Sequence, residues 1–337
     1  MGMKMAKGIT AFVCAGALAL GLSSCAGSDG ETNASADGET VKIGLITKTD
    51  TNPFFVKMRE MAKSAAEDQG AELIALAGKF DGDNEGQVAA IENLVSQGVQ
   101  GILITPNSST GILEAIASAR KAGVLVIALD TATDPEDAVD ATFATDNRKA
   151  GKMQGAYVKA ALGDKPVKLI MLDGTPGGTV DTYRHEGFLE GMGLQENSPE
   201  VAGKENTNGD QTKAQTAMEN LLQRIPDANS VYTINEPAAA GGYTAIESAG
   251  KAADIVVGSI DGSCTGVENV KKGIIGATVM QFPAKMAENG VKAVVEYAKS
   301  GTKPSGFVDT GAELITDKPV EGLDSKDTAW GLENCWG

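Results

Sequence analysis

The chain has 337 residues, of which 42% are apolar and only 4% aromatic, and its formal net charge at pH 7 is −16. A charge this negative argues against binding to nucleic acid, whose phosphates require a basic surface, and against peripheral binding to anionic lipid headgroups. The length is too great for one ordinary hydrophobic core and suits two domains.

The N-terminal segment has the pattern of an export signal. Lys4 and Lys7 form a short positive region, and an apolar run over residues 9–22 follows it. This run has the length of a signal h-region and is too short to span a bilayer comfortably. We therefore expect the protein to work outside the cytoplasmic membrane.

The apolar run ends in Leu22-Ser-Ser-Cys25, which resembles a bacterial lipobox. We predict a lipoprotein signal peptide over residues 1–24, a lipid on Cys25, and a flexible polar tether over residues 25–39. The alternative is an ordinary cleaved signal with an incidental Cys25.

From Val41 onward, short β-rich runs alternate with amphipathic helical runs. In the first half, the predicted strands cover residues 41–47, 71–77, 101–106, 124–130 and 141–145, and the predicted helices cover 53–69, 84–97 and 109–123. In the second half, the predicted helices cover 149–162, 180–192, 212–224, 238–249, 265–272 and 284–299, and the predicted strands cover 167–173, 230–234, 255–260 and 276–280. Strands that alternate with helices form parallel sheets with right-handed crossovers, so the sequence predicts two doubly wound α/β domains.

Polar residues follow most of these strands. In open parallel sheets, ligands bind beyond the carboxyl ends of the strands, so these residues are the candidates for a site. They are Lys48, Asp50, Asn52, Asn107, Asp130 and Thr131 in the first half, and residues 173–179, Asn235, Glu236, Asp261 and Gln281 in the second. Amides and carboxylates offer fixed donors and acceptors, which suits the recognition of a neutral polyhydroxylated molecule.

The sequence does not favour catalysis or metal binding. Asp130 and Asp261 could be imagined as the acid/base pair of a glycoside hydrolase, but a Gly-x-Ser-x-Gly elbow is absent. With His185 as its single histidine and no Cys-x-x-Cys spacing, the chain is expected to hold no metal and no cofactor. The segment 177–179 is interpreted as a turn that opens a helix and not as a phosphate-binding loop.

Two of the four cysteines, Cys264 and Cys335, lie in the body of the chain. Outside the membrane, an even pair of cysteines is most simply a disulfide, which would fix the C-terminal tail to the loop after Asp261. The alternative is two separate reduced cysteines in the core.

The segment Thr49-Asp-Thr-Asn-Pro-Phe-Phe55 is the most specific internal motif. It resembles the Asn-Pro-Phe-Phe segment of the ribose-binding protein and its relatives, the solute-binding proteins of ABC sugar importers. Further similar segments follow in the same order at 126–130, 145–147, 184–188, 235, 257–262 and 277–281. The chain is thus identified as a member of the type 1 periplasmic sugar-binding family, and Lys48 with Asp50 resembles its fructose-transport branch.

This resemblance implies two doubly wound parallel-sheet domains joined by a three-strand hinge. One domain would contain residues 40–147 and 282–309, and the other residues 148–281 and 310–337. The chain would cross between them near Asp146, near Gln281 to Pro283 and near Asp309.

The resemblance also implies roles for individual residues. Asn52 would meet sugar hydroxyls, Phe54 and Phe55 would cover the apolar face of the ring, and Asp130 would accept from two hydroxyls. Further ligand contacts are expected from Lys48, Asp50, Thr131, Asn147, Arg184, Asn235, Asp261 and Gln281.

Two of these positions depart from the pattern of ribose-binding proteins. Thr131 stands where those proteins carry an arginine, and Lys48 stands where they carry a serine and would supply a positive charge from another direction. Arg184 lies two positions beyond a sugar-contacting arginine of the family, where this chain has Thr182. For Arg184, the alternative is an ion pair with Asp181 or Glu186.

The predicted function is that of a lipid-anchored receptor on the extracytoplasmic face of the cell membrane. It would capture a monosaccharide, with fructose first and ribose second, and deliver it to an ABC permease without any chemistry on the sugar. The alternative is a sugar sensor coupled to a signalling or chemotaxis partner. By resemblance the protein is expected to be a monomer.

Overall fold

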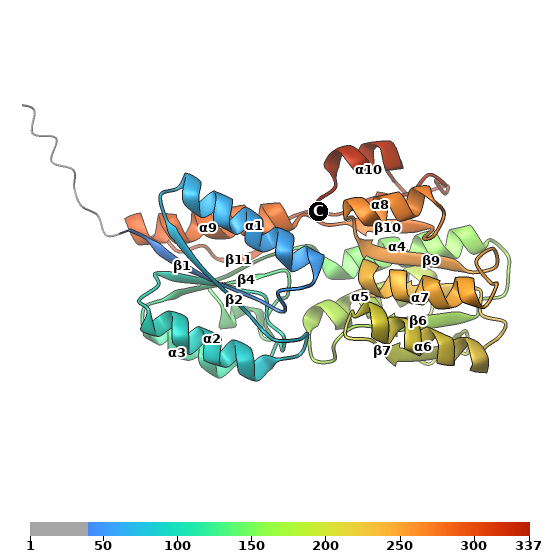
Figure 1. The fold of residues 1–337 in the computed structure, drawn as a ribbon, viewed down its shortest axis with the longest axis horizontal. Coiled ribbons are helices and arrows are strands. Elements are labelled where there is room, and N and C mark those ends of the chain that lie inside the picture. The colour runs from blue at the N-terminus through green and yellow to red at the C-terminus, as the bar shows by residue number, and fades with distance from the viewer. Residues whose placement is uncertain (1–39) are drawn as a thin grey trace, which may run out of the picture. The chain divides into compact units, whose positions relative to one another are not determined.

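The computed structural model describes residues 40–337, which form two lobes that each contain a six-stranded sheet (Figure 1). The predictions of a signal peptide, a lipid on Cys25 and a tether lie outside the described residues. Within residues 40–337, no helix is long and apolar enough to cross a membrane.

The first lobe contains a fully parallel sheet in the order β11-β5-β4-β3-β1-β2. Its strands are β1 (Lys42–Thr47), β2 (Glu72–Ala77), β3 (Gly101–Ile104), β4 (Leu125–Leu129), β5 (Ala141–Ala144) and β11 (Gly306–Asp309). Its helices are α1 (Pro53–Asp68), α2 (Asn84–Ser96), α3 (Leu113–Lys121) and α9 (Pro283–Ser300), with a short 3₁₀ turn at Glu136–Ala138. Helices α1 and α9 cover one face of the sheet, and α2 and α3 cover the other.

The second lobe repeats this plan with the order β12-β10-β9-β8-β6-β7, and only β12 runs antiparallel to its neighbour. Its strands are β6 (Leu169–Asp173), β7 (Val201–Asn206), β8 (Ser230–Thr233), β9 (Val256–Asp261), β10 (Ala277–Met280) and β12 (Glu313–Ile315). Its helices are α4 (Asn147–Leu162), α5 (Thr179–Met192), α6 (Gln211–Arg224), α7 (Glu236–Ser248), α8 (Cys264–Lys271) and α10 (Thr328–Asn334). The predicted fold class of two parallel-sheet α/β domains is thereby confirmed.

The central strands were predictable because they are buried on both faces. Strands β3, β4 and β6 have no exposed residue, and a strand buried on both faces has a continuous apolar sequence.

Helices α4 and α5 approach closely through glycines, since a Cβ added at Gly155 would lie 2.1 Å from the carbonyl oxygen of Phe188.

Strands β7, β11 and β12 and helix α10 are additions that the sequence did not predict. Strand β7 has the sequence Val-Ala-Gly-Lys-Glu-Asn at the edge of its sheet, and all four residues of β11 are exposed. Edge strands of this kind carry no apolar run and therefore give no periodic signal.

The chain passes between the lobes after β5, after β10 and after β11. Backbone and side-chain hydrogen bonds hold the first and third crossings together. The Thr310 amide donates to the Ala144 carbonyl at 2.9 Å, and the Asp146 amide donates to Oδ1 of Asp309 at 3.2 Å. The first and third connections are therefore joined to each other and are not independent linkers.

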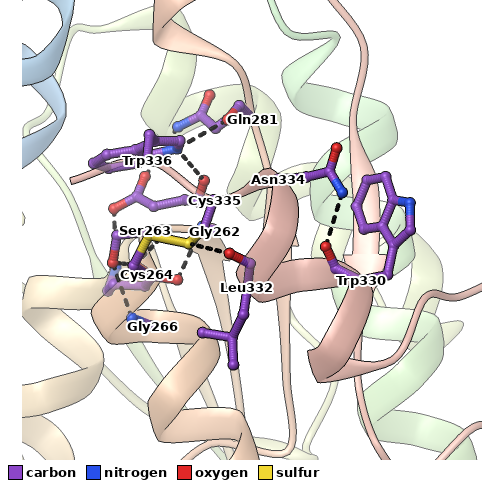
Figure 2. The surroundings of a disulfide bond; sticks show 12 residues. Gly262, Ser263, Cys264, Gly266, Gln281, Trp330, Leu332, Asn334, Cys335 and Trp336 are labelled. Carbon is purple, nitrogen blue, oxygen red and sulfur yellow. Dashed lines mark hydrogen bonds between the residues drawn. A yellow bond between two sulfur atoms is a disulfide. The ribbon is translucent and has the colours of Figure 1, made fainter.

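A disulfide joins Cys264, the first residue of α8, to Cys335, which follows α10 (Figure 2). The Cα atoms of the two cysteines are 4.9 Å apart, a usual separation for a bridged pair. The C-terminal tail is thus fixed to the second lobe next to the end of β9.

Candidate functional site

A cavity lies at the carboxyl ends of the strands and takes residues from both lobes. Nine of its lining residues are predicted site residues: Lys48, Asn52, Phe54, Phe55, Asp130, Arg184, Asn235, Asp261 and Gln281. The structure therefore brings together side chains that are more than 200 positions apart in the chain.

Three predicted site residues do not line this cavity. Asp50 is exposed in the loop before α1, where its carbonyl accepts a hydrogen bond from Arg59. Thr131 is buried, and its hydroxyl donates to Oδ2 of Asp130 at 2.9 Å. Asn147 is buried behind the cavity wall. A position after a strand does not by itself decide which way the side chain points.

The start of α1 fixes the aromatic part of the cavity. Asn52 is the N-cap of this helix, and its Oδ1 accepts from the Phe54 amide at 3.0 Å, with Pro53 in the first helical position. The rings of Phe54 and Phe55 meet edge to face with centroids 5.5 Å apart, and both are buried. The cap thus orients two adjacent rings at the cavity.

Lys48 and Asp130 contribute buried ionisable groups from the first lobe. Lys48 is only 7% exposed, and its main-chain carbonyl accepts from the side-chain Nδ2 of Asn107 at 3.4 Å. Asp130 adopts a left-handed backbone conformation with φ at 62°, which is uncommon for a residue other than glycine. Such strain at the end of a strand is typical of a functional position.

Arg184 crosses the floor of the cavity from the second lobe. Its Nε donates to Oδ1 of Asn147 at 2.7 Å, and its Nη1 donates to the Ile234 carbonyl at 2.9 Å. Asn147 in turn donates to the Asp130 carbonyl at 3.3 Å. Asn147 therefore holds Arg184 in place and links it to the first lobe.

Asp261 and Gln281 form a second buried pair. Nε2 of Gln281 donates to Oδ1 of Asp261 at 2.9 Å, and the Glu236 amide donates to Oδ2 of Asp261 at 3.2 Å. Burial and the nearby Glu236 carboxylate raise the pKa of Asp261 above its ordinary range. Within residues 40–337, Oε1 of Gln281 is buried and has no hydrogen-bond partner. A buried acceptor without a partner calls for a donor from a ligand or a water molecule.

Asn235 was expected to contact the ligand, but its side chain is bonded to the protein. It caps α7 by accepting from the Ala238 amide at 3.0 Å, and its Nδ2 donates to the Gly209 carbonyl at 3.2 Å. Both of its polar groups are therefore engaged with the protein, although the residue lines the cavity.

The sequence prediction missed three polar residues of the cavity lining, Asp81, Asp181 and Asn208, whereas Thr175, which also lines the cavity, lies in the candidate segment 173–179. Asp81 belongs to the first lobe, and it accepts from Thr175 at Oδ1 (2.6 Å) and from Asn208 at its carbonyl (3.3 Å). These two bonds connect the lobes directly. Asp81 and Asn208 lie in the loops that follow the edge strands β2 and β7. Because β7 was not predicted, the position of Asn208 after a strand end was not recognised.

A second connection between the lobes is formed by Ser109 and Thr179. The Ser109 amide donates to the Gly177 carbonyl at 3.0 Å, and its hydroxyl accepts from the Thr179 amide at 3.0 Å. The Thr179 hydroxyl donates to the Ala132 carbonyl at 2.8 Å. The segment between β6 and α5 therefore contacts the first lobe at two places.

In the part of the chain that the structure describes, no group of three or more His, Cys, Asp or Glu side chains could hold a metal ion. The cavity lining offers amides, carboxylates, cations and aromatic rings. It can enclose a small polar molecule and hydrogen-bond to it from both lobes.

Comparison with known proteins shows which family the chain resembles in sequence and fold. The sequence profile of the family described as periplasmic binding protein domain matches residues 43–303. The ribose import binding protein of Bacillus subtilis (strain 168) is 33% identical over 276 residues, which cover 82% of this chain and 87% of that protein.

Solved structures of ABC transporter solute binding proteins have the same fold. One from Agrobacterium vitis with bound D-fucose aligns at a TM-score of 0.77 and 25% identity, over 88% of this chain and 100% of that one. One from Actinobacillus succinogenes 130z with bound D-allose aligns at a TM-score of 0.74 and 26% identity, over 82% of this chain and 98% of that one.

Behind the cavity, His185 lies between two carboxylates. Its Nδ1 is 2.7 Å from Oδ1 of Asp173, and its Nε2 is 2.6 Å from Oε2 of Glu196, which also pairs with Lys204. Burial opposes protonation of the ring, but the Asp173 and Glu196 carboxylates outweigh it and raise the pKa of His185 to about 9. The imidazolium therefore bridges the end of β6 to the segment before β7.

We expect His185 to make stability dependent on pH. Because its folded-state pKa is above the ordinary value of 6.5, the stabilisation is complete below pH 6.5 and is lost as the pH rises through about 9. Thermal unfolding of the wild type and His185→Gln at several pH values should show the largest difference near pH 6 and little difference at pH 10. A difference that stays constant from pH 6 to 10 would contradict this account.

Proposed function

We propose that this chain, which belongs to the periplasmic sugar-binding proteins of ABC importers, captures a monosaccharide between its two lobes and delivers it to an ABC permease. Members of this family are non-enzymatic substrate-binding proteins, and the chain is accordingly not an enzyme. In the proposal, residues 40–147 with 282–309 and residues 148–281 with 310–337 are the two bodies that close on the sugar.

The observation that carries this proposal is the buried Oε1 of Gln281, which has no hydrogen-bond partner among residues 40–337 and lies in a cavity with two phenylalanine rings. A sugar hydroxyl would donate to this oxygen, while the apolar C–H face of the sugar ring would pack on Phe54 or Phe55. Asp130, Asn52 and the remaining polar groups would take the other hydroxyls.

The identity of the sugar is proposed from the two positions, Thr131 and Lys48, at which this chain departs from the pattern of ribose-binding proteins. Thr131 holds the Asp130 carboxylate and does not line the cavity, whereas Lys48 does line it and brings a buried cation from the first lobe. This supports the idea that Lys48 replaces the family arginine as a cationic donor. We place fructose first and ribose second, the latter supported by the ribose import protein of Bacillus subtilis as a relative.

We further propose that a lipid on Cys25 anchors the receptor to the extracytoplasmic face of the cell membrane and that the Cys264–Cys335 bond forms after export. The lipobox-like sequence before Cys25 supports the first point. The geometry of the cysteine pair and an oxidising compartment support the second.

The function is tested by sugar binding to purified protein that lacks residues 1–25. Calorimetry and thermal shift against fructose, ribose, xylose, galactose and inositol should show saturable binding of at least one sugar, with a rise in the melting temperature.

Asp130→Ala should raise the Kd about tenfold or more, since a buried hydrogen bond to a charged group contributes roughly 1.5–3 kcal/mol. Asp137→Ala, an exposed carboxylate a few residues away, serves as the control. Failure of every sugar to bind would refute the proposal.

Lys48 should determine the preference between sugars. We expect Lys48→Ser to weaken fructose binding about tenfold and to change the ratio of fructose to ribose affinity, because the variant loses a buried cationic donor. Lys63→Ser, which removes an exposed cation on α1, should leave both affinities unchanged. An unchanged ratio in Lys48→Ser would exclude Lys48 as a specificity residue.

Cys25 should carry the lipid. In the full-length chain, Cys25→Ser is expected to abolish labelling with a radioactive fatty acid and to move the protein from the membrane fraction to the soluble fraction. Cys14→Ser provides a matched control within the leader and should stay in the membrane fraction. Continued lipid labelling of Cys25→Ser would rule out this anchor.

A further inference from the structure

The penultimate residue of the chain, Trp336, lies directly after the disulfide-bonded Cys335 (Figure 2). The Cys264 amide donates to the Trp336 carbonyl at 3.0 Å, so backbone and disulfide together fix this residue to the start of α8. The tail that carries Trp336 is therefore attached to the second lobe.

The indole of Trp336 contacts the back of the cavity. It is only 6% exposed, and its Nε1 donates to the Gln281 carbonyl at 3.0 Å and to the Asp261 carbonyl at 3.2 Å. Asp261 and Gln281 end β9 and follow β10, and their side chains line the cavity. Gln281 is also where the chain crosses from the second lobe to α9 of the first. One N–H group thus supports two cavity residues and one hinge segment.

The ring of Trp336 belongs to the hydrophobic core of the first lobe. It meets Phe54 edge to face, with the ring centroids 5.4 Å apart, and shares the cluster of buried residues that contains Phe55 and Met286. Phe54 in turn lines the cavity. A side chain that is covalently fixed to the second lobe therefore packs against an aromatic ring of the first lobe, directly behind the site.

We propose that Trp336 is a positioning residue for sugar binding: it sets the Phe54 ring and the Asp261–Gln281 pair in place, and the Cys264–Cys335 bond holds Trp336 there. Without the indole, the Asp261 and Gln281 carbonyls lose a donor inside the protein, and Phe54 loses the ring that supports its edge. This inference rests on the proposed sugar-binding function.

The contribution of Trp336 is measured with two substitutions. Trp336→Phe keeps an aromatic ring and removes the two hydrogen bonds, so the Kd for the bound sugar should rise about threefold to tenfold. Trp336→Leu also removes the ring contact with Phe54 and should weaken binding further. Trp330→Phe is the matched control, because Trp330 lies on α10 in the same tail and outside the cavity lining.

A spectroscopic readout separates positioning from general stability. The chain has two tryptophans, so Trp330→Phe leaves Trp336 as the single fluorophore. Sugar binding should change the emission of Trp336 in this variant because Phe54 lies against its ring. All affinities are measured well below the melting temperature of each variant, where a merely destabilised protein would bind with the affinity of the wild type.

The role of the disulfide is tested with Cys264→Ser/Cys335→Ser. We expect this double variant to weaken sugar binding and to shift the Trp336 emission to longer wavelength in the Trp330→Phe background, as the indole is released to water. Mass spectrometry after alkylation without reduction first establishes that the wild type carries the bond. Unchanged affinity and unchanged emission in the double cysteine variant would overturn the role of the disulfide in holding Trp336.

A failure of the proposed sugar-binding function can be distinguished from a failure of the role inferred for Trp336. If the wild type binds no sugar, hydrogen exchange of the segments that contain Phe54 and Gln281 still tests Trp336, since both segments should exchange faster in Trp336→Leu than in Trp330→Phe. Equal exchange in the two variants would overturn the positioning role by itself. Wild-type binding with unchanged affinity in Trp336→Phe and Trp336→Leu would overturn the inference and leave the function intact.

Discussion

Four ionisable side chains are buried in one cavity, and their need for partners shapes the rest of the molecule. Lys48, Asp130, Arg184 and Asp261 are each less than 8% exposed, and buried charges are costly unless hydrogen bonds or opposite charges compensate them. Thr131 donates to the Asp130 carboxylate, Gln281 donates to the Asp261 carboxylate, and Asn147 accepts from Arg184 while it donates to the main-chain carbonyl of Asp130. The residue that holds Arg184 in place therefore also connects the two lobes.

The fold was predictable to the extent that burial leaves a pattern in the sequence. Central strands such as β4, with five buried apolar residues, and helices with Pro or Asn at their starts were visible because packing and capping demand particular residue types. The edge strands β7 and β11 were not visible, since hydrogen bonds to one neighbour hold them in place without an apolar face. Pairing partners are a property of the whole sheet and not of a local segment.

The site was predictable from two kinds of information. Strand ends of a parallel sheet located Asn52, Asp130, Asp261 and Gln281, and a family resemblance added Arg184 and the two phenylalanine rings. The direction of a side chain could not be derived in this way. For this reason the sequence did not reveal that Thr131 bonds to its neighbour Asp130 or that Asn235 caps a helix. Asp81 was missed for another reason: its contacts with Thr175 and Asn208 exist only when the two lobes meet, and one chain segment contains no information about that encounter.

If the two lobes close on a sugar as proposed, the contacts of Ser109 have an energetic consequence. Four residues join the lobes without lining the cavity: Ser109, Ala132, Gly177 and Thr179. Their hydrogen bonds therefore stabilise the closed form whether or not a sugar is present. A bond that contributes about 1 kcal/mol raises the closed population of the empty protein roughly fivefold and tightens the apparent affinity by up to the same factor. Under the proposed function, these hydrogen bonds therefore favour high affinity for the sugar but also increase the number of empty, closed molecules that could compete at the permease.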